Sequence, residues 1–475
     1  MAGPALVWPP RADASPAIAF PKGPPNDPGY APAEASPPPC STVSVNDEQF
    51  YLYSFLPRCA TAARDPEGAS GMSVDRAWAN YTTGRPDTVI AYVEGGINWH
   101  DTDVAELSNK VYLNMGELPV PCRASGPCVT RHSDRLSDYD LNHDGVLDAA
   151  DYASDPRVHD VNGNGVIDPE DVIAAFSCYD ERTETIGKAT WPGGHLHCSN
   201  GAAGVDNDHD GYPHDISGWD FYDGQNDPAT VDGAYGHAND QMRQAAAQTN
   251  NGLLGAGICP RCTILPVKAG AEAIDGPVQL AEAWMYAADA GASVIVSVTA
   301  DAAHSSVLAD ALRYVESKGV VVVESSNDFD SVDHQGGMYW PGVLPGNSLV
   351  ANTAGVSGAA AANSRTTTFR ARSDETSWGP HNVFSVPTQG GSTSEATPTL
   401  GAVVALLLSW GKEAAARHLI SSPLTGPEAV QVLRATASPV DDPAPAWPGG
   451  PGWSEQYGYG RPNVAAAMQA VAEGR

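Results

Sequence analysis

One stretch of this chain constrains its fold more than any other. A small-residue turn, Gly390-Gly-Ser-Thr-Ser-Glu-Ala-Thr-Pro398, runs directly into the apolar run Leu400-Gly-Ala-Val-Val-Ala-Leu-Leu-Leu408. The run is too short to span a membrane and is apolar on all sides, which predicts a helix buried at the centre of a domain. Ser394 would then lie close to the free N–H groups at the positive end of that helix, where an oxyanion is stabilised. The alternative is that Ser394 only caps the helix.

The chain alternates between short β-type runs and helical patterns. The β-type runs cover residues 87–97, 263–268, 292–298, 320–323 and 349–353, and the helical patterns cover 74–81, 278–289 and 306–317. Such alternation predicts an α/β fold, a doubly wound and mostly parallel sheet with helices on both faces. In this architecture the active site lies at the carboxyl ends of the strands. Glu94 ends the first run, and His237 precedes an Ala-rich helical segment, so both are candidates for that edge together with Ser394.

Ordered blocks of the chain resemble the subtilisin-like serine peptidases (subtilases) over roughly residues 70–470. Glu94-Gly-Gly96 matches the turn that carries the family's acid, and 237–252 matches its His block without a gap. Ser392-Thr-Ser-Glu-Ala-Thr-Pro398 matches its Ser block, and 457–463 resembles its closing segment. The order acid, His, Ser is the one that subtilisin has. The resemblance implies a subtilisin-like fold with these catalytic residues: Glu94, His237 and Ser394, with Asn327 as the oxyanion donor.

Departures from the family pattern bear on activity. Glu94 stands where the family has Asp, so the backbone must recede by about one carbon–carbon bond for the carboxylate to orient His237. The turn Gly95-Gly96 is consistent with such an adjustment. Ala238 and Asn239 replace the Gly-Thr that follows the family's His. The edge that would pair with a peptide is bulkier than in the family, and its implied substrate-binding residues are Ser297, Val298, Thr299, Glu324 and Ser325.

Two functions therefore stay open. The favoured one is a secreted, calcium-stabilised serine endopeptidase with a polypeptide substrate, because a decayed enzyme has no chemical reason to keep Ser394, His237 and Asn327 together. The alternative is a catalytically impaired pseudopeptidase that acts as a calcium-dependent binding protein. Reaction with a fluorophosphonate would separate the two, because only an activated Ser reacts.

Two acidic segments, 140–151 and 160–171, share the pattern of calcium-binding loops. Each has oxygen-bearing residues at positions 1, 3, 5, 9 and 12 and a glycine, Gly145 or Gly165, at position 6. Calcium requires six to eight oxygen ligands around a tight turn. Both loops end in Asp, which resembles dockerin-type loops; the alternative is a pair of solvated acidic turns. With the backbone carbonyl at position 7, the predicted ligands are Asp140, Asn142, Asp144, Val146, Asp148 and Asp151, then Asp160, Asn162, Asn164, Val166, Asp168 and Asp171.

A third acidic stretch, 206–215, resembles a loop that many subtilisin relatives carry ahead of the catalytic His. Its predicted ligands are Asp206, Asp208, Asp210 and Asp215, and His214 stands where an acid is expected. We expect residues 118–215 to be a calcium-bearing insertion in a peptidase domain that covers 46–475. Residues 1–45 are rich in Pro and Ala and are predicted to be an extended or disordered arm.

Charge and cysteine content limit the partners and the compartment. The 475 residues include 57 Asp and Glu against 26 Lys and Arg, a net charge of −31, which argues against nucleic acid and anionic membranes as partners. Eight cysteines indicate an oxidising compartment, so we expect an extracellular or otherwise extracytoplasmic monomer, although the first residues do not resemble a signal peptide. The predicted pairs are nearest neighbours: Cys40–Cys59, Cys122–Cys128, Cys178–Cys198 and Cys259–Cys262. The last pair could instead be a redox pair or half of a zinc site.

Overall fold

The structure is a computed structural model, and it describes most but not all of the chain. The described residues are 19–30, 49–54, 71–101, 103–123, 128–192, 195–231, 233, 235–272, 274, 276–298, 305–325, 349–354, 382–388, 392–438, 453 and 457–474. The residues named above that lie outside these ranges include Cys40, Cys59, Thr299, Asn327 and Gly390.

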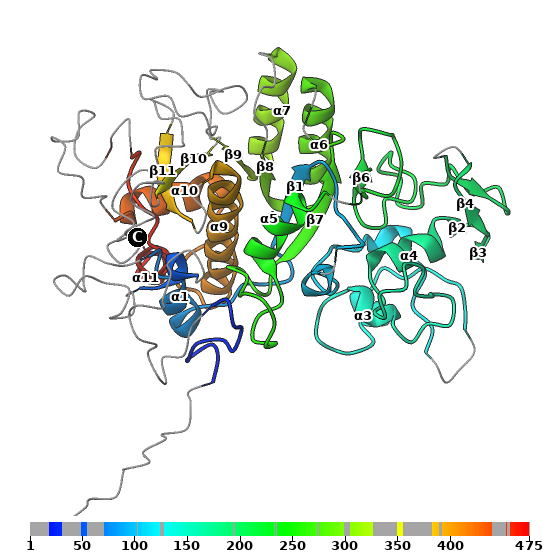
Figure 1. Cartoon of the computed structure of the whole chain (residues 1–475), viewed down its shortest axis with the longest axis horizontal. Helices are drawn as coiled ribbons and strands as arrows, with labels where there is room; N and C mark the ends of the chain where they lie inside the picture. The colour runs from blue at the N-terminus through cyan, green and yellow to red at the C-terminus, as the bar shows by residue number, and fades with distance from the viewer. Residues whose placement is uncertain are drawn as a thin grey trace, which may run out of the picture.

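A parallel sheet forms the centre of the described chain (Figure 1). Its order is β11-β10-β9-β8-β1-β7-β6, and every pair of neighbouring strands is parallel. The strands are β1 (Val89–Glu94), β6 (Trp219–Asp220), β7 (Thr263–Lys268), β8 (Ala292–Ser297), β9 (Val321–Ser325), β10 (Leu349–Ala354) and β11 (Asn382–Pro387). The predicted doubly wound α/β sheet is confirmed.

Helices cover both faces of this sheet, because successive side chains of a strand point to opposite faces. Val89 and Val93 of β1 belong to the core on one face, with α6 (Pro277–Asp289) and α7 (Ser306–Ser317). Ile90 of β1 belongs to the core on the other face. The helices on that second face are α1 (Val74–Asn80), α5 (His237–Ala246), α9 (Thr393–Ala416), α10 (Gly426–Thr436) and α11 (Val464–Ala472). Because helices bury these strands on both faces of the sheet, the strand sequences are nearly continuous apolar runs.

Helix α9 is the central helix that the apolar run predicts. It is long and apolar enough to cross a membrane by length and composition, but 78% of its most apolar stretch is buried inside the protein. A Cβ added to Gly401 would come within 2.4 Å of Val296 Cγ2, so this glycine lets the helix lie close against β8. α9 is therefore a core helix.

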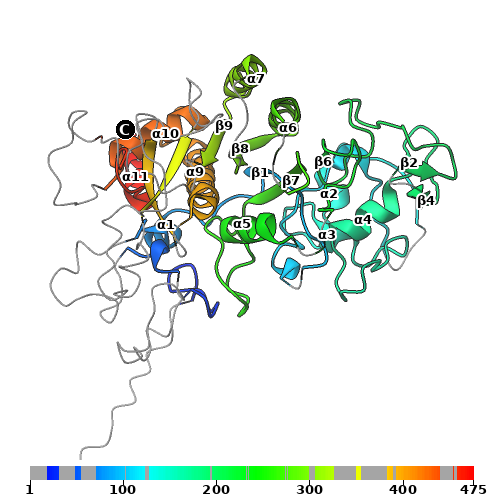
Figure 2. The same ribbon diagram turned by 45° about the horizontal axis from the view of Figure 1, so that its top comes forward.

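The acidic insertion forms a separate group of small elements beyond the β6 edge of the sheet, at the right of Figures 1 and 2. The insertion contains the helices and strands α2 (Leu136–Tyr139), α3 (Ala149–Tyr152), α4 (Pro169–Phe176), β2 (Tyr179–Asp180), β3 (Thr185–Ile186), β4 (Ala189–Thr190) and β5 (His197–Cys198). Two 3-10 helices, η2 (Val104–Glu106) and η3 (Met115–Glu117), precede it in the chain. Disulfides join Cys122 to Cys128 and Cys178 to Cys198, and a third joins Cys259 to Cys262 beside the sheet. These three predicted disulfides are confirmed. Because both sulfurs of Cys259 and Cys262 are in a disulfide, they do not form half of a zinc site.

Candidate active site

Glu94 lies at the carboxyl end of β1 and faces His237, the first residue of α5. The Glu94 side chain is buried, whereas 43% of the His237 side chain is exposed. Glu94 Oε1 lies 2.6 Å from His237 Nδ1. Nδ1–H therefore donates to the carboxylate, and in the tautomer assigned by this hydrogen bond Nε2 is the unprotonated nitrogen that can accept a proton. Nε2 also lies 3.4 Å from Nε2 of Gln241.

Three further donors hold the same carboxylate. Gln241, one turn along α5 from His237, donates from Nε2 to Glu94 Oε1 at 3.3 Å. Glu94 Oε2 accepts from the backbone N–H of Gly95 and from the hydroxyl of Tyr235. Burial, followed by the nearby charge of Glu94, raises the pKa of Tyr235 far above its ordinary value, so the phenol keeps its proton and remains a donor.

The glycine turn after Glu94 makes room for these contacts. Gly96 has a φ of +97°, which an L side chain rarely adopts. A Cβ on Gly95 would lie 2.9 Å from Cα of Glu272 and 3.0 Å from Cε1 of Tyr235. A side chain at position 95 would push the Tyr235 ring and the Glu272 backbone away from the carboxylate, and one at position 96 would meet the backbone oxygen of Pro228 at 2.6 Å.

Ser394 opens the central helix within reach of the same cleft. The N-cap of α9 is Ser392, and Ser394 is the second residue of the helix, so its position is not that of the cap. Ser394 and His237 line one cavity of about 420 Å³. The other residues that line this cavity are Gln49, Tyr51, Glu106, Asp240, Gln241, Arg243, Gln244, Ala247, Leu254, Gly255, Ala256, Ser392 and Glu395.

The N-terminal segment supplies one wall of this cavity, a contribution that the sequence did not reveal. Gln49 precedes η1 (Phe50–Leu52) and pairs through both side-chain amide atoms with the backbone of Ala256, at 2.8 Å each. Asp27 is buried and accepts backbone N–H groups from residues 250, 251 and 252. Residues 19–30, part of the predicted arm, are thus packed against the domain.

The charges along the cavity are mostly negative. Glu106, Asp240 and Glu395 line it against a single cation, Arg243. Arg243 already pairs with Asp103 at 3.0 Å and with Asp240. Burial raises the pKa of Glu106 above its ordinary value, and the carboxylates around it add to this effect.

The predicted substrate-binding residues lie at one edge of the sheet where the structure describes them. Ser297 and Glu324 are register partners at the ends of β8 and β9, and both are buried. Val298 follows β8 and is partly buried, and Ser325 ends β9. This edge is the carboxyl end of the parallel strands, as expected for a doubly wound sheet. Thr299 and the predicted oxyanion donor Asn327 lie outside the described residues.

The three acidic loops share one turn. The first Asp of each loop accepts the backbone N–H of the glycine five residues later: Asp140 from Gly145 at 3.0 Å, Asp160 from Gly165 at 2.9 Å, and Asp206 from Gly211 at 2.9 Å. All three glycines have positive φ, between 84° and 102°. The predicted role of these glycines as turn formers is therefore seen in each loop.

In each of the first two loops, the last two acidic residues also lie at the start of a helix. Asp148 and Asp151 form a capping box at the start of α3, and Asp168 and Asp171 form one at the start of α4. All four side chains are buried. Burial, together with the nearby Asp144 and Asp151 carboxylates and against the hydrogen bond from the Ala150 N–H, raises the pKa of Asp148 to about 7. The side chains predicted as ligands thus have a structural role as well.

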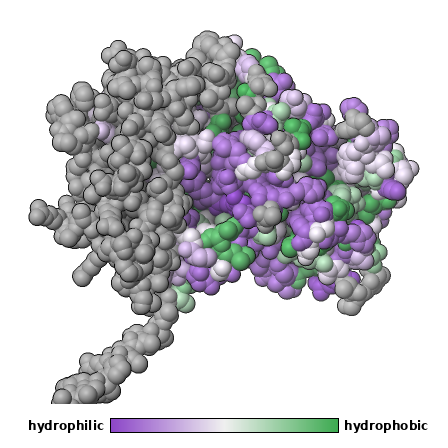
Figure 3. All heavy atoms as spheres, in the orientation of Figure 1, coloured by the Kyte–Doolittle hydropathy of each residue, from purple (hydrophilic) through white to green (hydrophobic). Residues whose placement is uncertain are grey.

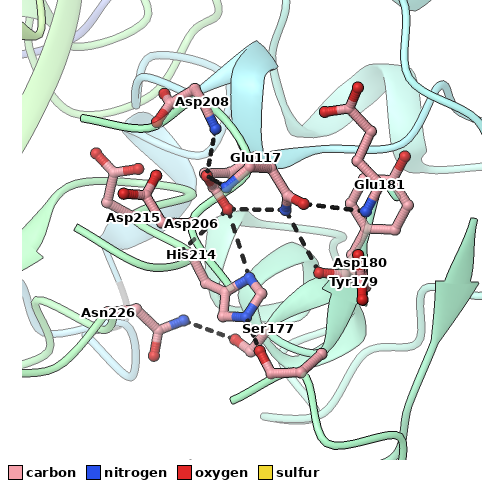
Figure 4. Close-up of polar contacts among 12 residues, drawn as sticks. Glu117, Ser177, Tyr179, Asp180, Glu181, Asp206, Asp208, His214, Asp215 and Asn226 are labelled. Carbon is pink, nitrogen blue, oxygen red and sulfur yellow. Dashed lines mark hydrogen bonds and ion pairs between the residues drawn. The ribbon is translucent and has the colours of Figure 1, made fainter. Parts of the chain in front are cut away.

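The third loop converges with a residue that the sequence did not single out. Carboxylate oxygens of Glu117, Asp208 and Asp215 lie within 4.8 Å of one another, and so do those of Asp206, Asp208 and Asp210. Glu117 is fully buried and also lies 3.4 Å from Nδ1 of His214 (Figure 4). It is 89 residues or more from the loop in sequence, so no local pattern could have joined them.

This acidic cluster has the chemistry of a hard-cation site. Burial, together with the Asp210 and Asp208 carboxylates, raises the pKa of Asp215 well above its ordinary value. Burial and the Asp208 and Asp206 carboxylates raise the pKa of Asp210 to about 6. Carboxylate oxygens are the ligands that Ca²⁺ prefers, and a bound divalent cation would offset this repulsion. The residues therefore fit calcium.

The face of the molecule seen in Figure 3 is largely hydrophilic where it is described, and its apolar side chains lie in small separate groups. Among the described residues, the exposed large apolar side chains include Leu253 and Leu254, and Leu254 lines the cavity beside Ser394.

Comparison with known proteins gives relatives of one kind. No family model matches the chain. The chain is 37% identical over 115 residues to a thermophilic serine proteinase of Bacillus sp. (strain AK1), which covers 24% of this chain and 28% of that protein. It is 29% identical over 204 residues to thermitase of Thermoactinomyces vulgaris, which covers 42% of this chain and 69% of thermitase.

Solved structures similar to this chain include proteases from Pseudoalteromonas arctica, with 18% identity, a TM-score of 0.48, and coverage of 94% of this chain and 99% of that one. The PatG macrocyclase in complex with peptide has 15% identity, a TM-score of 0.45, and coverage of 85% and 96%. The two sequence relatives, a serine proteinase and thermitase, together with the parallel sheet described above, support a subtilisin-like family of serine peptidases for this chain.

Proposed function

We propose that this protein is a serine endopeptidase that works through a Ser394–His237–Glu94 triad. The observation that carries the proposal is the 2.6 Å contact between His237 Nδ1 and Glu94 Oε1, on a His that lines the same cavity as Ser394. The serine proteinases among its relatives support the same reaction class.

In this mechanism His237 Nε2 takes the proton of Ser394 Oγ while the oxygen attacks the peptide carbonyl. The N-terminus of α9 stabilises the oxyanion that forms. His237 then gives the proton to the leaving amine, the C–N bond breaks, and an acyl-enzyme remains. Water, deprotonated by His237, releases the second product and restores Ser394. Glu94 keeps the ring in the correct tautomer and stabilises the imidazolium. Asn327 is proposed as a further oxyanion donor.

The substrate we propose is a polypeptide that pairs with the edge formed by β8 and β9, at Ser297, Val298, Thr299, Glu324 and Ser325. The acidic lining of the cavity favours peptides with basic residues near the cleaved bond over acidic ones, because like charges repel at close range. Peptide pairs that differ only by Lys against Glu in this region would measure the preference. Equal kcat/KM values for both members of each pair would refute it.

Calcium is proposed as a stabilising ion, held by Asp206, Asp208, Asp210, Asp215 and Glu117. Two further ions are proposed for the loops 140–151 and 160–171, which share the same glycine turn. The three disulfides support an extracytoplasmic location, and we propose that the protein acts there as a monomer.

A fluorophosphonate tests the proposed reaction directly. Ser394 should be labelled, Ser394→Ala should abolish labelling, and Ser392→Ala, two residues away, should leave it intact. Labelling that survives Ser394→Ala would refute the assignment. If wild-type protein is not labelled at all, the pseudopeptidase alternative becomes the better account, and calcium-dependent peptide binding would be the property to measure.

A further inference from the structure

Tyr235 has contacts that connect it to the triad without touching the reacting atoms. Its hydroxyl donates to Glu94 Oε2 and lies 2.8 Å from the backbone oxygen of Glu272. It stands two residues before His237, whose Nδ1 contacts the other oxygen of the same carboxylate. One short turn, Tyr235-Gly236-His237, therefore brings a donor to each oxygen of Glu94.

A glutamate needs such a donor more than an aspartate does. Glu has one more rotatable bond than Asp, so more side-chain conformational entropy is lost when its carboxylate is held in one orientation. His237 and Gln241 both contact Oε1, so they leave the rotation of the carboxylate about its last bond weakly constrained. The donors on Oε2, Tyr235 and the Gly95 N–H, fix that rotation.

The surrounding backbone is shaped for the tyrosine. Cε1 of Tyr235 lies 3.0 Å from where a Cβ of residue 95 would be, so only a glycine there leaves space for the ring. Glu272 closes the other side of the same position. The paired glycines after Glu94 thus admit the ring of Tyr235 as well as the turn itself.

We infer that Tyr235 is a positioning residue that holds the longer acid of this triad in line with His237. The inference rests on the proposed function and adds a residue that the resemblance to the family does not supply. Tyr235 transfers no proton in this role. It compensates for the extra methylene of Glu94 by fixing the oxygen that His237 does not use.

A double-mutant cycle tests the inference, because it asks whether Tyr235 serves only the longer acid. Tyr235→Phe should lower kcat on a peptide substrate, and the rate of acylation by a fluorophosphonate, by about 10- to 100-fold with KM nearly unchanged, the scale of a misplaced catalytic group. In the Glu94→Asp background the same change should alter the rate by less than about twofold, because the shorter carboxylate does not reach the hydroxyl. Equal effects of Tyr235→Phe in both backgrounds, or no effect in wild type, would overturn the inference.

A spectroscopic measurement separates positioning from general destabilisation. The Nδ1 proton held between His237 and Glu94 should give a far-downfield proton NMR signal in the wild type, and this signal should broaden in Tyr235→Phe as the carboxylate becomes mobile. An unchanged signal would contradict the role of Tyr235. The matched control is Tyr314→Phe, which removes a hydroxyl from the Asp289 carboxylate outside the catalytic and calcium sites and should leave the acylation rate and the signal unchanged.

Failure of the proposed reaction and failure of the positioning role of Tyr235 give different results. If wild-type protein does not react with the fluorophosphonate, the proposed reaction is wrong, whereas the NMR comparison still measures whether Tyr235 orders Glu94. If wild-type protein reacts and Tyr235→Phe reacts at the same rate, the reaction stands and the positioning role is wrong.

Discussion

Two tyrosines that donate to carboxylates, the partly buried Tyr235 and the buried Tyr286, have different surroundings. Tyr235 donates to Glu94, whose other oxygen contacts His237. Tyr286 on α6 donates to Asp215 at 2.7 Å, and Asp215 lies beside the carboxylates of Asp208 and Glu117. Burial followed by the adjacent carboxylate raises the pKa of both tyrosines, so both stay protonated donors.

The difference lies in the charge that each carboxylate meets. Glu94 faces an imidazole that becomes positive during the proposed reaction, so its negative charge is balanced within the protein. Asp215 faces carboxylates, and their mutual repulsion is relieved by a proton or a metal ion. In our proposal, the same local pair of residues supports proton transfer in one place and cation binding in the other.

The largest expected effect comes from removing the charge of Glu94. Glu94→Gln should lower kcat by about 10⁴-fold with little loss of stability, because an amide can hold the wrong tautomer and cannot stabilise imidazolium. Thermal unfolding and the acylation rate measure the two properties separately. A variant that keeps more than a tenth of the wild-type rate would show that Glu94 is not the orienting acid.

Glu94→Asp sharpens the same test. We expect the rate to fall, because the turn at Gly95 and Gly96 and the donor Tyr235 are placed for the longer side chain. A gain in acylation rate would mean that Glu94 is a lesion in a decayed site and would favour the pseudopeptidase.

Calcium removal should produce the next largest effect. At a calcium concentration 100 times Kd, binding to the native state alone adds about 2.7 kcal/mol of stability, and excess EDTA should remove it. We expect Kd values of roughly 10⁻⁴–10⁻³ M or tighter, the range of extracellular modules. Asp208→Asn should reduce the calcium-dependent shift in melting temperature, whereas Asp134→Asn, a fully exposed acid, should not. A melting curve that EDTA leaves unchanged would refute the calcium proposal.

The smallest effect concerns Glu106, a buried carboxylate of the cavity. Its pKa is raised by burial, so the folded state binds its proton more tightly than the unfolded state does. Its contribution to stability therefore becomes less favourable as pH rises from about 4.5 through the raised value. Glu106→Gln should be relatively more stable than wild type at pH 8 than at pH 4, by about 1 kcal/mol or less. Denaturant unfolding at the two pH values measures this, and an equal difference at both would show that Glu106 has no part in the pH dependence.

Most of the sheet could be predicted from the sequence, because each strand and helix carries its pattern locally. The runs at 263–268 and 306–317 correspond to β7 and α7, and α9 is the buried helix that its apolar run predicts. The disulfides that the structure describes join near neighbours, which spacing alone suggests. The acidic loops were predictable for the same reason, since a loop closes on residues within twelve positions of one another.

Contacts between distant segments were decided only by the tertiary structure. Tyr235 meets Glu94 across 141 residues, and Glu117 meets Asp208 across 91. Gln49 packs against Ala256 across 207 residues to form a wall of the cavity. No periodicity or motif records such pairs, because they depend on how the sheet and its loops pack in space. The sequence therefore determined which side chains are candidates for catalysis and metal binding, and the packing determined which neighbours surround their charges.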